Sequence, residues 1–591
     1  MIQTLLIANR GEIAVRIIRA CRDLGIRTAA VFSDADRDAL HVRMADTAFH
    51  LGESPARHSY LAIDRLIDAA RHTGANAVHP GYGLLSESAE FAIAVADAGL
   101  IFVGPGPDVL ATMGDKVAAR AAAQACGVPI LAGSGAVSGA AADALAAAIG
   151  FPILVKSAGG GGGRGMRVVR DASSLAVALT DASREAASSF GKAEVFLERY
   201  LERPRHVEVQ ILADRHGAIL HLGDRDCSVQ RRHQKVIEEA PAPDLPPSLR
   251  ARLHDAAIAL ARSVGYVGAG TAEFLVDAAN DQFFFLEMNP RLQVEHGVTE
   301  LVTGIDIVAW QLRIAAGEKL SFAQEDVRIA GHAIQARIGA EDPSQGFRPA
   351  PGPIGHLKLP SGPWLRTDFG VEAGDVVPPY YDSMIGKLLA WGEDREAARA
   401  RLLRSFSEFA VGPLPSNTTY LQQVLTDPTF ASIGHDIQWL ERDGPATGHA
   451  APQPEPAKPS EAAAPSQFRL RVLTTPNGVI ELETFVERPA ARTNLQRVSR
   501  SATPAGNVAA KQGQPTAPID GTLVKLLVAS GDRVVAGDMV AVVEAMKMEL
   551  SIPTPIGGVV GAIHVQTGMT VKSGTVLLTI TPAPERPSAD R

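Results

Sequence analysis

The stretch TLLIANRGEIAVRIIRACRDLG, residues 4–25, decides the fold class of the first part of the chain. A short apolar run is followed by a turn and then by apolar residues at helical spacing. Up to residue 114 the pattern continues with TAAVFS, LAIDRLIDAARHTG, NAVHP, FAIAVADAG and LIFVG. This alternation predicts an α/β, Rossmann-like domain over residues 1–114, with a parallel sheet covered by helices on both faces. The first turn lacks the full G-x-G-x-x-G pattern, so we expect no dinucleotide there.

The length and charge of the whole chain limit the classes of protein to consider. With 591 residues, it is too long for one core, so several domains are expected. A formal net charge of -8 without a basic tract argues against nucleic acid as a partner. Neither a long apolar run nor a signal peptide is recognisable, so we expect no membrane span and a cytoplasmic location. The three cysteines, Cys21, Cys126 and Cys227, are then expected to be reduced thiols.

The composition changes after about residue 440, where a mixed α/β pattern ends. Residues 441–466 are rich in Pro, Ala and Ser, which predicts a linker. Residues 467–486 carry alternating apolar positions around an Asn-Gly pair, which predicts a short β segment that we interpret as a candidate docking element for a partner. A second linker is predicted over residues 487–515.

An internal repeat marks the last segment, residues 516–581. PIDGTLVKLLVASGDRVVAGDMVAVV starts at Pro518 and aligns with PIGGVVGAIHVQTGMTVKSGTVLLTI, which starts at Pro555, an offset of 37 residues (555 − 518). Two related β-rich halves predict a small, all-β flattened barrel. Three pairs of glycines coincide in the alignment and are expected to provide turns with positive φ. These pairs are Gly521 with Gly558, Gly531 with Gly568, and Gly537 with Gly574.

Lys547 lies between the two halves, at the predicted tip of an exposed hairpin. A lysine on an exposed turn is usually just solvated, but a tip on a small domain behind linkers suits covalent modification and delivery. The segment resembles the biotinyl carrier domain of biotin-dependent carboxylases, whose attachment motif Ala-Met-Lys-Met is present as residues 545–548. Lipoyl domains share that fold but usually lack both methionines. The resemblance implies that a biotin protein ligase attaches biotin to Lys547.

Two upstream stretches favour a nucleotide site by their residue types alone. ILVKSAGGGGGRGMRVV, residues 153–169, predicts two strands around a glycine loop whose backbone N–H groups suit phosphate oxygens. EFLVDAANDQFFFLEMNPRLQVEH, residues 273–296, predicts two strands that carry Glu273 and Glu287, with Asn289 close behind. Hard oxygen ligands on paired strands suit Mg²⁺, although a salt-bridged strand pair would also explain the acids.

Residues 1–440 resemble the biotin carboxylase subunit, an ATP-grasp enzyme. The matching segments, in order, are IANRGEIAVR, HPGYG, GDK, KSAGGGGGRGMR, ERYLERPRHVEVQ, DCSVQRRHQKVIEEAP, EMNPRLQVEH and YYDSMIGKL. The resemblance implies an ATP-grasp domain over residues 115–330, with a lid over about 131–203, and a biotin carboxylase C-terminal domain over residues 331–440. Gly297 stands where the family usually has proline, a change that could loosen the loop after Glu295.

The same resemblance assigns roles to individual residues. It implies that ATP is bound by Lys116, Lys156, Gly161, Gly162, Gly163, Glu198, His206, Gln230 and His233. It implies that Mg²⁺, or Mn²⁺ in its place, is held by Glu273, Glu287 and Asn289. Bicarbonate would be held by Arg291, Gln293 and the backbone of Val294. The implied catalytic residues are Glu295 as general base, Arg337 beside the biotin enolate, Arg291, and Lys235 against bicarbonate or carboxyphosphate. Such charged groups suit the activation of two poor nucleophiles by charge neutralisation.

Together the two resemblances imply a ligase of fatty acid metabolism. The expected function is ATP- and bicarbonate-dependent carboxylation of biotin on the chain's own carrier, within an acyl-CoA carboxylase of acetyl-/propionyl-CoA type. A separate carboxyltransferase (β) subunit is expected to complete a hetero-oligomer, because the chain has no segment left for that activity. The alternatives are a pyruvate carboxylase subunit, another ATP-grasp ligase with a lipoyl-type carrier, and a non-catalytic scaffold.

Overall fold

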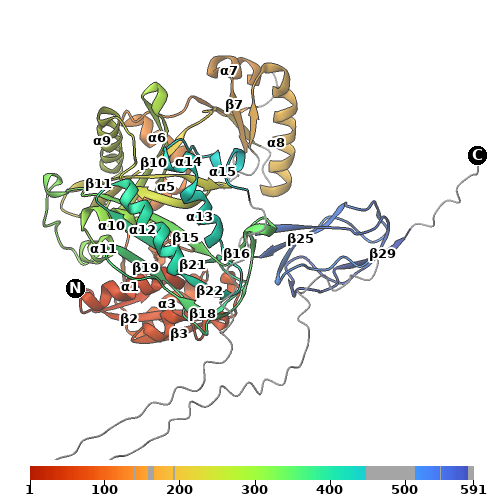
Figure 1. Cartoon of the computed structure of the whole chain (residues 1–591), viewed down its shortest axis with the longest axis horizontal. Helices are drawn as coiled ribbons and strands as arrows, with labels where there is room; N and C mark the ends of the chain where they lie inside the picture. Colours follow the sequence, from red (N-terminus) through yellow and green to blue (C-terminus); the bar gives the residue numbers. More distant parts are fainter. Residues whose placement is uncertain (138–140, 158–165, 191–193, 447–512, 546–547, 583–591) are drawn as a thin grey trace, which may run out of the picture. The chain divides into compact units, whose positions relative to one another are not determined.

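The computed structural model describes residues 1–137, 141–157, 166–190, 194–446, 513–545 and 548–582 (Figure 1). These residues form two compact units, Met1–Thr447 and Gly448–Arg591. Several positions predicted from the sequence lie outside the described residues: Gly161, Gly162, Gly163, Lys547, the 467–486 segment and most of both linkers. The predicted first linker overlaps the structure slightly, because the helix α15 (Trp439–Arg442) continues two residues into it.

The N-terminal region contains the predicted parallel sheet. Its strand order is β3-β2-β1-β4-β5, and every pairing is parallel. The strands are β1 (Thr4–Ile7), β2 (Arg27–Ser33), β3 (Thr47–Gly52), β4 (Ala77–His79) and β5 (Ile101–Phe102). The helices between and after them are α1 (Gly11–Asp23), α2 (Leu40–Met44), α3 (Ile63–Thr73), α4 (Ala89–Asp97) and α5 (Pro107–Gly114).

Alternate residues of β1 point into two different cores. Leu5 packs in one core with apolar residues of α1, whereas Leu6 packs in the other with residues of α3 and α4. Successive side chains of a strand face opposite sides of the sheet. Both faces of this sheet are therefore covered by helices, as the alternation of apolar runs predicts.

A second, smaller sheet follows the helix α6 (Lys116–Ala125). Its order is β6-β9-β7-β8, with antiparallel pairings throughout. The strands are β6 (Gly133–Val137), β7 (Ile153–Ser157), β8 (Arg167–Val169) and β9 (Val195–Arg199), and the helices are α7 (Ala141–Ile149) and α8 (Leu175–Phe190). The predicted strands on either side of the glycine run are confirmed as β7 and β8. The two helices lie beside this sheet (Figure 1).

The largest sheet of the first unit has eight antiparallel strands in the order β14-β13-β10-β11-β12-β15-β21-β19. Their bounds are β10 (Arg205–Ala213), β11 (Ile219–Arg231), β12 (Gln234–Ala240), β13 (Gly268–Asp277), β14 (Gln282–Asn289), β15 (His332–Gly339), β19 (Leu365–Phe369) and β21 (Met384–Gly392). Its helices are α9 (Pro247–Ser263), α10 (His296–Thr303), α11 (Ile307–Ala315), α12 (Arg395–Glu408), α13 (Thr418–Thr426) and α14 (Pro428–Ala431). The smaller strands are β16 (Glu341–Asp342), β17 (Arg348–Pro349), β18 (Gly352–Lys358), β20 (Val376–Val377) and β22 (Ala410–Pro413).

The second unit is all β, with strand orders β26-β25-β23-β28 and β24-β27-β29. Its strands are β23 (Gly521–Leu526), β24 (Arg533–Val534), β25 (Met539–Ala545), β26 (Met548–Pro553), β27 (Gly558–Ile563), β28 (Thr570–Val571) and β29 (Leu578–Pro582). The strands repeat with the same 37-residue offset as the sequence. β23 and β27 begin 37 residues apart (558 − 521), and so do β24 and β28 (570 − 533). The two halves predicted from the repeat are confirmed.

Two of the three glycine pairs have the predicted positive φ. These are Gly531 and Gly568, at 96° and 88°, and Gly537 and Gly574, at 95° and 84°. The third pair, Gly521 and Gly558, does not. At Gly558 a Cβ would come within 2.1 Å of the Thr581 carbonyl oxygen, so close packing and not backbone conformation requires glycine there.

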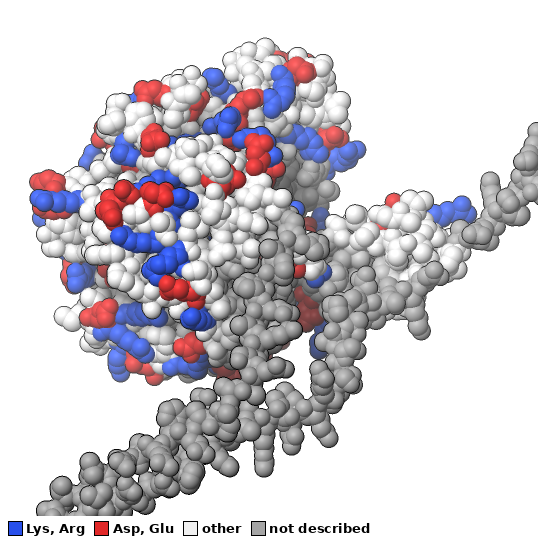
Figure 2. Space-filling model, in the orientation of Figure 1, with Lys and Arg blue, Asp and Glu red and all other residues white. Residues whose placement is uncertain are grey.

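Charges of both signs are interspersed over the visible face of the first unit (Figure 2). Within the residues that the structure describes, no helix is both long enough and apolar enough to cross a bilayer.

Candidate active site

A row of charged residues crosses one face of the eight-stranded sheet. Residues directly opposite each other on antiparallel strands share a face. One part of the row runs through Glu287, Glu273, Glu208 and Arg225, on β14, β13, β10 and β11. The other part runs through Arg337, Lys387 and Asp368, on β15, β21 and β19. Lys235 on β12 contacts Glu208 and Glu273 of the first part. We call these eight residues the charged row.

Lys235 neutralises a cluster of carboxylates that would otherwise repel one another. Its Nζ lies 2.5 Å from Glu208 Oε2, 2.9 Å from Glu273 Oε1 and 2.7 Å from Glu295 Oε1. Arg225, which is fully buried, donates from Nε to the other oxygen of Glu208. Burial alone would raise the pKa values of Glu208 and Glu273, but Lys235 and His206, together with Arg225 at Glu208, outweigh it and lower both below their usual range. The cluster therefore keeps ionised carboxylates away from water.

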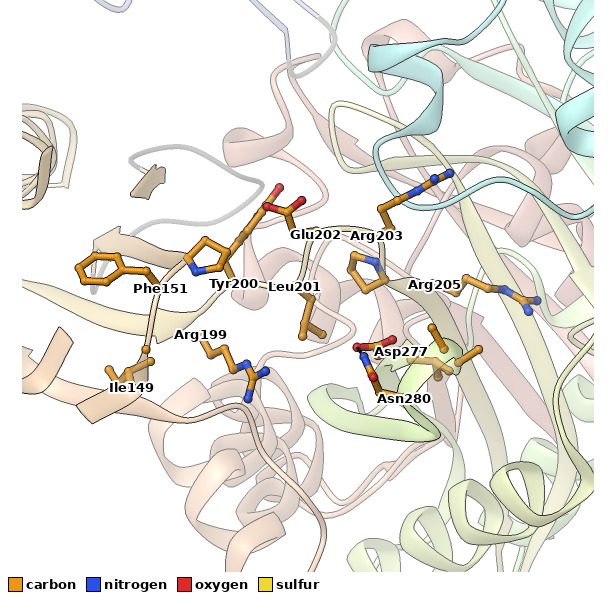
Figure 3. A pocket seen from close by; sticks show the side chains of 16 residues that line it. Ile149, Phe151, Arg199, Tyr200, Leu201, Glu202, Arg203, Arg205, Asp277 and Asn280 are labelled. Carbon is orange, nitrogen blue, oxygen red and sulfur yellow. Dashed lines mark hydrogen bonds between the residues drawn. The ribbon is translucent and has the colours of Figure 1, made fainter. Parts of the chain in front are cut away.

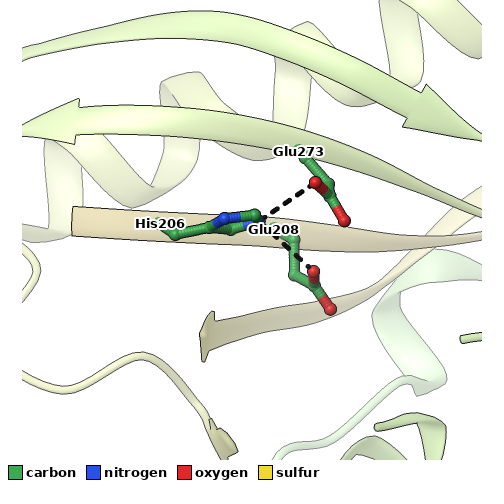
Figure 4. Close-up of side chains that lie close together, drawn as sticks. All are labelled: His206, Glu208 and Glu273. Carbon is green, nitrogen blue, oxygen red and sulfur yellow. Dashed lines mark ion pairs between the residues drawn. The ribbon is translucent and has the colours of Figure 1, made fainter. Parts of the chain in front are cut away.

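His206 adds a third cation, after Lys235 and Arg225, to the same cluster (Figure 4). Its Nε2 lies 3.2 Å from Glu273 Oε2 and 3.6 Å from Glu208 Oε2. Gln230 Nε2 lies 3.0 Å from the other ring nitrogen, Nδ1. Burial opposes protonation of this ring, but Glu273 and Glu208 together prevail and raise the pKa of His206 to about 9.

The loop after β14, residues 290–295, crosses the charged row. Gln293 Nε2 donates to Glu273 Oε1 at 3.3 Å. Glu295 is fully buried. Its Oε2 accepts a hydrogen bond from Arg337 Nη2 at 3.0 Å, and its Oε1 accepts one from Lys235 Nζ. Arg291 binds Asn289 Oδ1 at 3.0 Å and pairs with Glu87. The predicted bicarbonate and base residues thus lie on one short loop above one sheet.

The donor set of Glu273, Glu287 and Asn289 fits a hard divalent cation. Glu273 and Glu287 lie directly opposite each other on β13 and β14, and Asn289 follows on the same face. Burial, and next the charge of Glu273, raise the pKa of Glu287. Lys116 Nζ approaches Glu287 Oε2 only to 3.9 Å. Two facing carboxylates and an amide oxygen are ligands that Mg²⁺ prefers, and the ion would relieve their repulsion.

The other predicted ATP ligands lie on separate elements. Lys156 on β7 and Glu198 on β9 form an ion pair on the smaller sheet, and Arg120 of α6 also binds Glu198. Lys116 is the first residue of α6. His233 lies in the turn between β11 and β12, with a φ of 62°. The structure therefore brings the predicted metal, bicarbonate and base residues together. Of these four ATP residues, Lys116 lies 3.9 Å from Glu287, whereas the others lie on β7, on β9 and in the β11–β12 turn.

Sequence reasoning missed several buried members of the site. Glu208 and Arg225 were not predicted, and neither was Glu238, which accepts from Arg337 Nε. RHVEVQ carries polar side chains at alternate positions of a buried strand, a signal that could have revealed Glu208. Cys227, expected only as a reduced thiol, lies 3.8 Å from Glu295 Oε1, and burial raises its pKa.

The expectation for Gly297 was wrong. This residue lies not in a loosened loop but in the first turn of α10, where it is buried. A Cβ at this position would come within 2.6 Å of Leu389 Cδ2. The helix therefore packs closely on β21, and this packing holds the end of the 290–295 loop.

A pocket of about 610 Å³ lies at the ends of β10 and β13 (Figure 3). Segments 149–152, 199–205 and 276–280 line it, so it borders both the smaller and the eight-stranded sheet. None of the predicted site residues contributes to its lining.

Comparisons with known protein families match four consecutive parts of the chain. Residues 1–110 match "Biotin carboxylase, N-terminal domain" and residues 115–323 match "Carbamoyl-phosphate synthase L chain, ATP binding domain". Residues 335–442 match "Biotin carboxylase C-terminal domain", and residues 514–580 match "Biotin-requiring enzyme".

Two curated relatives illustrate the similarity. Biotin carboxylase of Allochromatium vinosum is 51% identical over 450 residues, which are 75% of this chain and 98% of the relative. Methylcrotonoyl-CoA carboxylase subunit alpha, mitochondrial, of Oryza sativa subsp. japonica is 49% identical over 447 residues, which are 75% of this chain and 60% of the relative.

Two solved structures share the fold of the first unit. The biotin carboxylase domain of Hydrogenobacter thermophilus 2-oxoglutarate carboxylase, in complex with MgADP, ADP and bicarbonate, matches with a TM-score of 0.72 and 41% identity, over 76% of this chain and 100% of that chain. Rhizobium etli pyruvate carboxylase with acetyl coenzyme-A matches with a TM-score of 0.71 and 43% identity, over 76% of this chain and 41% of that chain.

Proposed function

Because the chain belongs to the biotin carboxylase family, we propose that it uses ATP and bicarbonate to carboxylate biotin held on Lys547 of its own carrier domain. The family membership confirms the predicted fold class: a biotin carboxylase with N-terminal, ATP-grasp and C-terminal domains, followed by a β-rich biotinyl domain. It also confirms a biotin carboxylase ligase, with biotin, ATP and Mg²⁺ as cofactors.

The observation that carries the proposal is the ionised cluster around Lys235, with Glu295 and Arg337 at its edge. In this proposal Arg291, Gln293 and the Val294 N–H bind bicarbonate beside Lys235. Glu295 accepts a proton from bicarbonate, and Arg337 provides a fixed positive charge where an oxyanion develops. When bound, Mg²⁺ would be held by Glu273, Glu287 and Asn289 and would supply positive charge against the phosphates, and biotin would supply the ureido nitrogen that receives the carboxyl group. Preorganised charges of this kind cost no reorganisation during the reaction.

For the final acceptor we propose an acyl-CoA, of acetyl- or propionyl-CoA type, with a separate carboxyltransferase subunit as partner. A carrier domain and a carboxylase within one chain support this assignment, as does the similarity to an alpha subunit of methylcrotonoyl-CoA carboxylase. The name of that relative suggests methylcrotonoyl-CoA as a competing acceptor, and the similarity to a pyruvate carboxylase suggests pyruvate. Acceptor-dependent incorporation of labelled bicarbonate by the purified complex separates acetyl-CoA, propionyl-CoA, methylcrotonoyl-CoA and pyruvate.

The first test of the function uses the full chain. After expression with a biotin protein ligase, it should bind avidin and gain the mass of one biotinyl group. It should then cleave ATP only when bicarbonate and biotin are both present. A lipoyl group on the chain, or ATP cleavage indifferent to bicarbonate, would contradict the proposal.

A Glu287→Gln substitution should raise the Mg²⁺ concentration needed for half-maximal ATP cleavage by about tenfold or more. The change removes one of two carboxylates that we assign to the ion, and hard cations bind more weakly as ligand charge falls. Titration with MgCl₂ at fixed ATP provides the measurement. Glu90→Gln, which changes an exposed acid in the first turn of α4, serves as the control. An unchanged Mg²⁺ midpoint would remove Glu287 from the metal site.

A further inference from the structure

Lys387 is a member of the charged row to which the proposed function gives no role. It lies on β21, directly opposite Arg337 of β15, and its side chain is fully buried. Side chains at opposite positions share a face, so Lys387 and Arg337 approach the 290–295 loop from the same side. A buried ammonium group is costly unless it is paired, so its partners show what it does.

The partners of Lys387 come from three separate parts of the chain. Its Nζ donates to the Val294 carbonyl oxygen at 2.8 Å and forms an ion pair with Glu12 Oε1 at 3.1 Å. Asp368 Oδ2 is 4.0 Å away and is itself bound by Arg366. The only neutral acceptor among these partners is the loop carbonyl. Lys387 therefore links the loop to a buried counter-charge.

Two consecutive peptide groups of the loop are fixed in this way. Lys387 holds the carbonyl of Val294, and His296 Nδ1 lies 2.7 Å from the carbonyl oxygen of Gln293. Burial lowers the pKa of His296 well below its usual value, so the ring is neutral and Nδ1 carries the donated proton. In a trans peptide the C=O and N–H bonds point in opposite directions. Because Lys387 and His296 hold the two carbonyls, the N–H groups of Val294 and Glu295 point away from these two side chains.

Glu12, the counter-charge of Lys387, lies where the N-terminal region packs against the eight-stranded sheet. Glu12 lies in the first turn of α1, and Tyr82 donates its hydroxyl hydrogen to Glu12 Oε1. A Cβ at Gly370 would come within 2.4 Å of the Glu12 backbone nitrogen, so the chain after β19 abuts this turn closely. Three motifs without assigned chemistry, IANRGEIAVR, HPGYG and YYDSMIGKL, thus supply Glu12, Tyr82 and Lys387 to one network.

We propose that Lys387 is a positioning residue for bicarbonate. Its hydrogen bond to the Val294 carbonyl orients the peptide groups that bind bicarbonate and carry Glu295, and Glu12 is its buried counter-ion. This inference rests on the proposed function, because it takes Arg291, Gln293 and Val294 as the bicarbonate site.

The test compares Glu12→Gln with the double variant Glu12→Gln/Lys387→Met in the full chain. Lys387→Met alone would leave Glu12 buried and unpaired, which could prevent folding. The double variant removes both charges. Glu12→Gln keeps an amide oxygen as acceptor for Lys387, with Asp368 as the remaining counter-charge at 4.0 Å, and preserves the bond to Val294. Relative to Glu12→Gln, the double variant should show an increased KM for bicarbonate and about a 10²-fold lower kcat/KM for it. The KM for ATP should remain within about twofold.

Equal bicarbonate kinetics in the two variants would overturn the proposal, and so would a matched rise in both KM values, which indicates a general structural role. Hydrogen exchange in a peptide spanning residues 290–298 gives a readout independent of activity. Exchange there should be faster in the double variant than in Glu12→Gln, and equal exchange would overturn the positioning role. The unsubstituted protein could lack bicarbonate-dependent ATP cleavage while exchange is still faster in the double variant. That result would uphold the anchoring of the loop by Lys387 and overturn only the proposed function.

Discussion

Glu295→Gln is expected to lower the rate of biotin- and bicarbonate-dependent ATP cleavage by about 10²–10⁴-fold, the usual contribution of a general base. The amide has nearly the shape of the carboxylate but cannot accept a proton at neutral pH. Burial would raise the pKa of Glu295, yet Lys235, Arg337 and Arg225 together lower it, so the native residue is ionised and able to act as a base. Steady-state rates with free biotin over a range of bicarbonate concentrations give the measurement.

The Glu295→Gln protein should remain folded, because its cations keep other partners. Lys235 retains Glu208 and Glu273, and Arg337 retains Glu238. Glu239→Gln is a matched control: Glu239 is also almost fully buried, and it pairs with His332 and Arg395 instead of the charged row. We expect this control to lose stability but to keep its rate per folded molecule. A similar loss of rate in both variants would show that burying an amide, and not removing a base, causes the effect.

The alternation rules that predict the N-terminal sheet work because its strands and helices alternate locally along the chain. Leu5 and Leu6 face different cores, as a period of two requires. The Glu273–Glu287 pair is equally accessible to sequence reasoning, since a short turn joins the two strands. In both cases the contacts join neighbouring segments, and the local pattern suffices.

The position of Glu238 could not be predicted, because a β-bulge changes the phase of its strand. Val229 pairs with Ile237, but Gln230 pairs with Lys235, so β12 contains one extra residue, Val236, at this point. Lys235 and Glu238 are three residues apart and would face opposite sides of a regular strand. The bulge returns them to one face, where Lys235 contacts Glu295 and Glu238 contacts Arg337.

Lys387 could not be predicted for a different reason. Its role depends on the pairing of β15 with β21, strands that lie far apart in the sequence and pair through the tertiary fold. Within β21 the segment MIGKLLAWG reads as a buried strand with one lysine. Nothing in this local pattern indicates that the lysine reaches the carbonyl of Val294, 93 residues earlier.

The largest effect is expected for Lys547→Arg, which should abolish carboxylation of the final acceptor. Arginine keeps the positive charge, but its guanidinium is not a substrate for amide formation with biotin. The proposed carboxylase site lies within Met1–Thr447, a different unit from Lys547, so carboxylation of free biotin should remain within about twofold of the unsubstituted protein.

The linker explains why one carrier can serve two active sites in this proposal. The predicted linker of 29 residues (487 to 515) would span roughly 30 Å on average as a flexible chain. Fully extended, it would reach at most about 100 Å. In this proposal, transfer depends on a biotin attached to Lys547. Avidin blotting and labelled-bicarbonate incorporation into the acceptor measure the two steps separately.

Lys525→Arg, at an exposed position on β23, should retain both signals. Persistent avidin binding by Lys547→Arg would place the biotin on another residue, and persistent acceptor carboxylation would exclude Lys547 as the carrier.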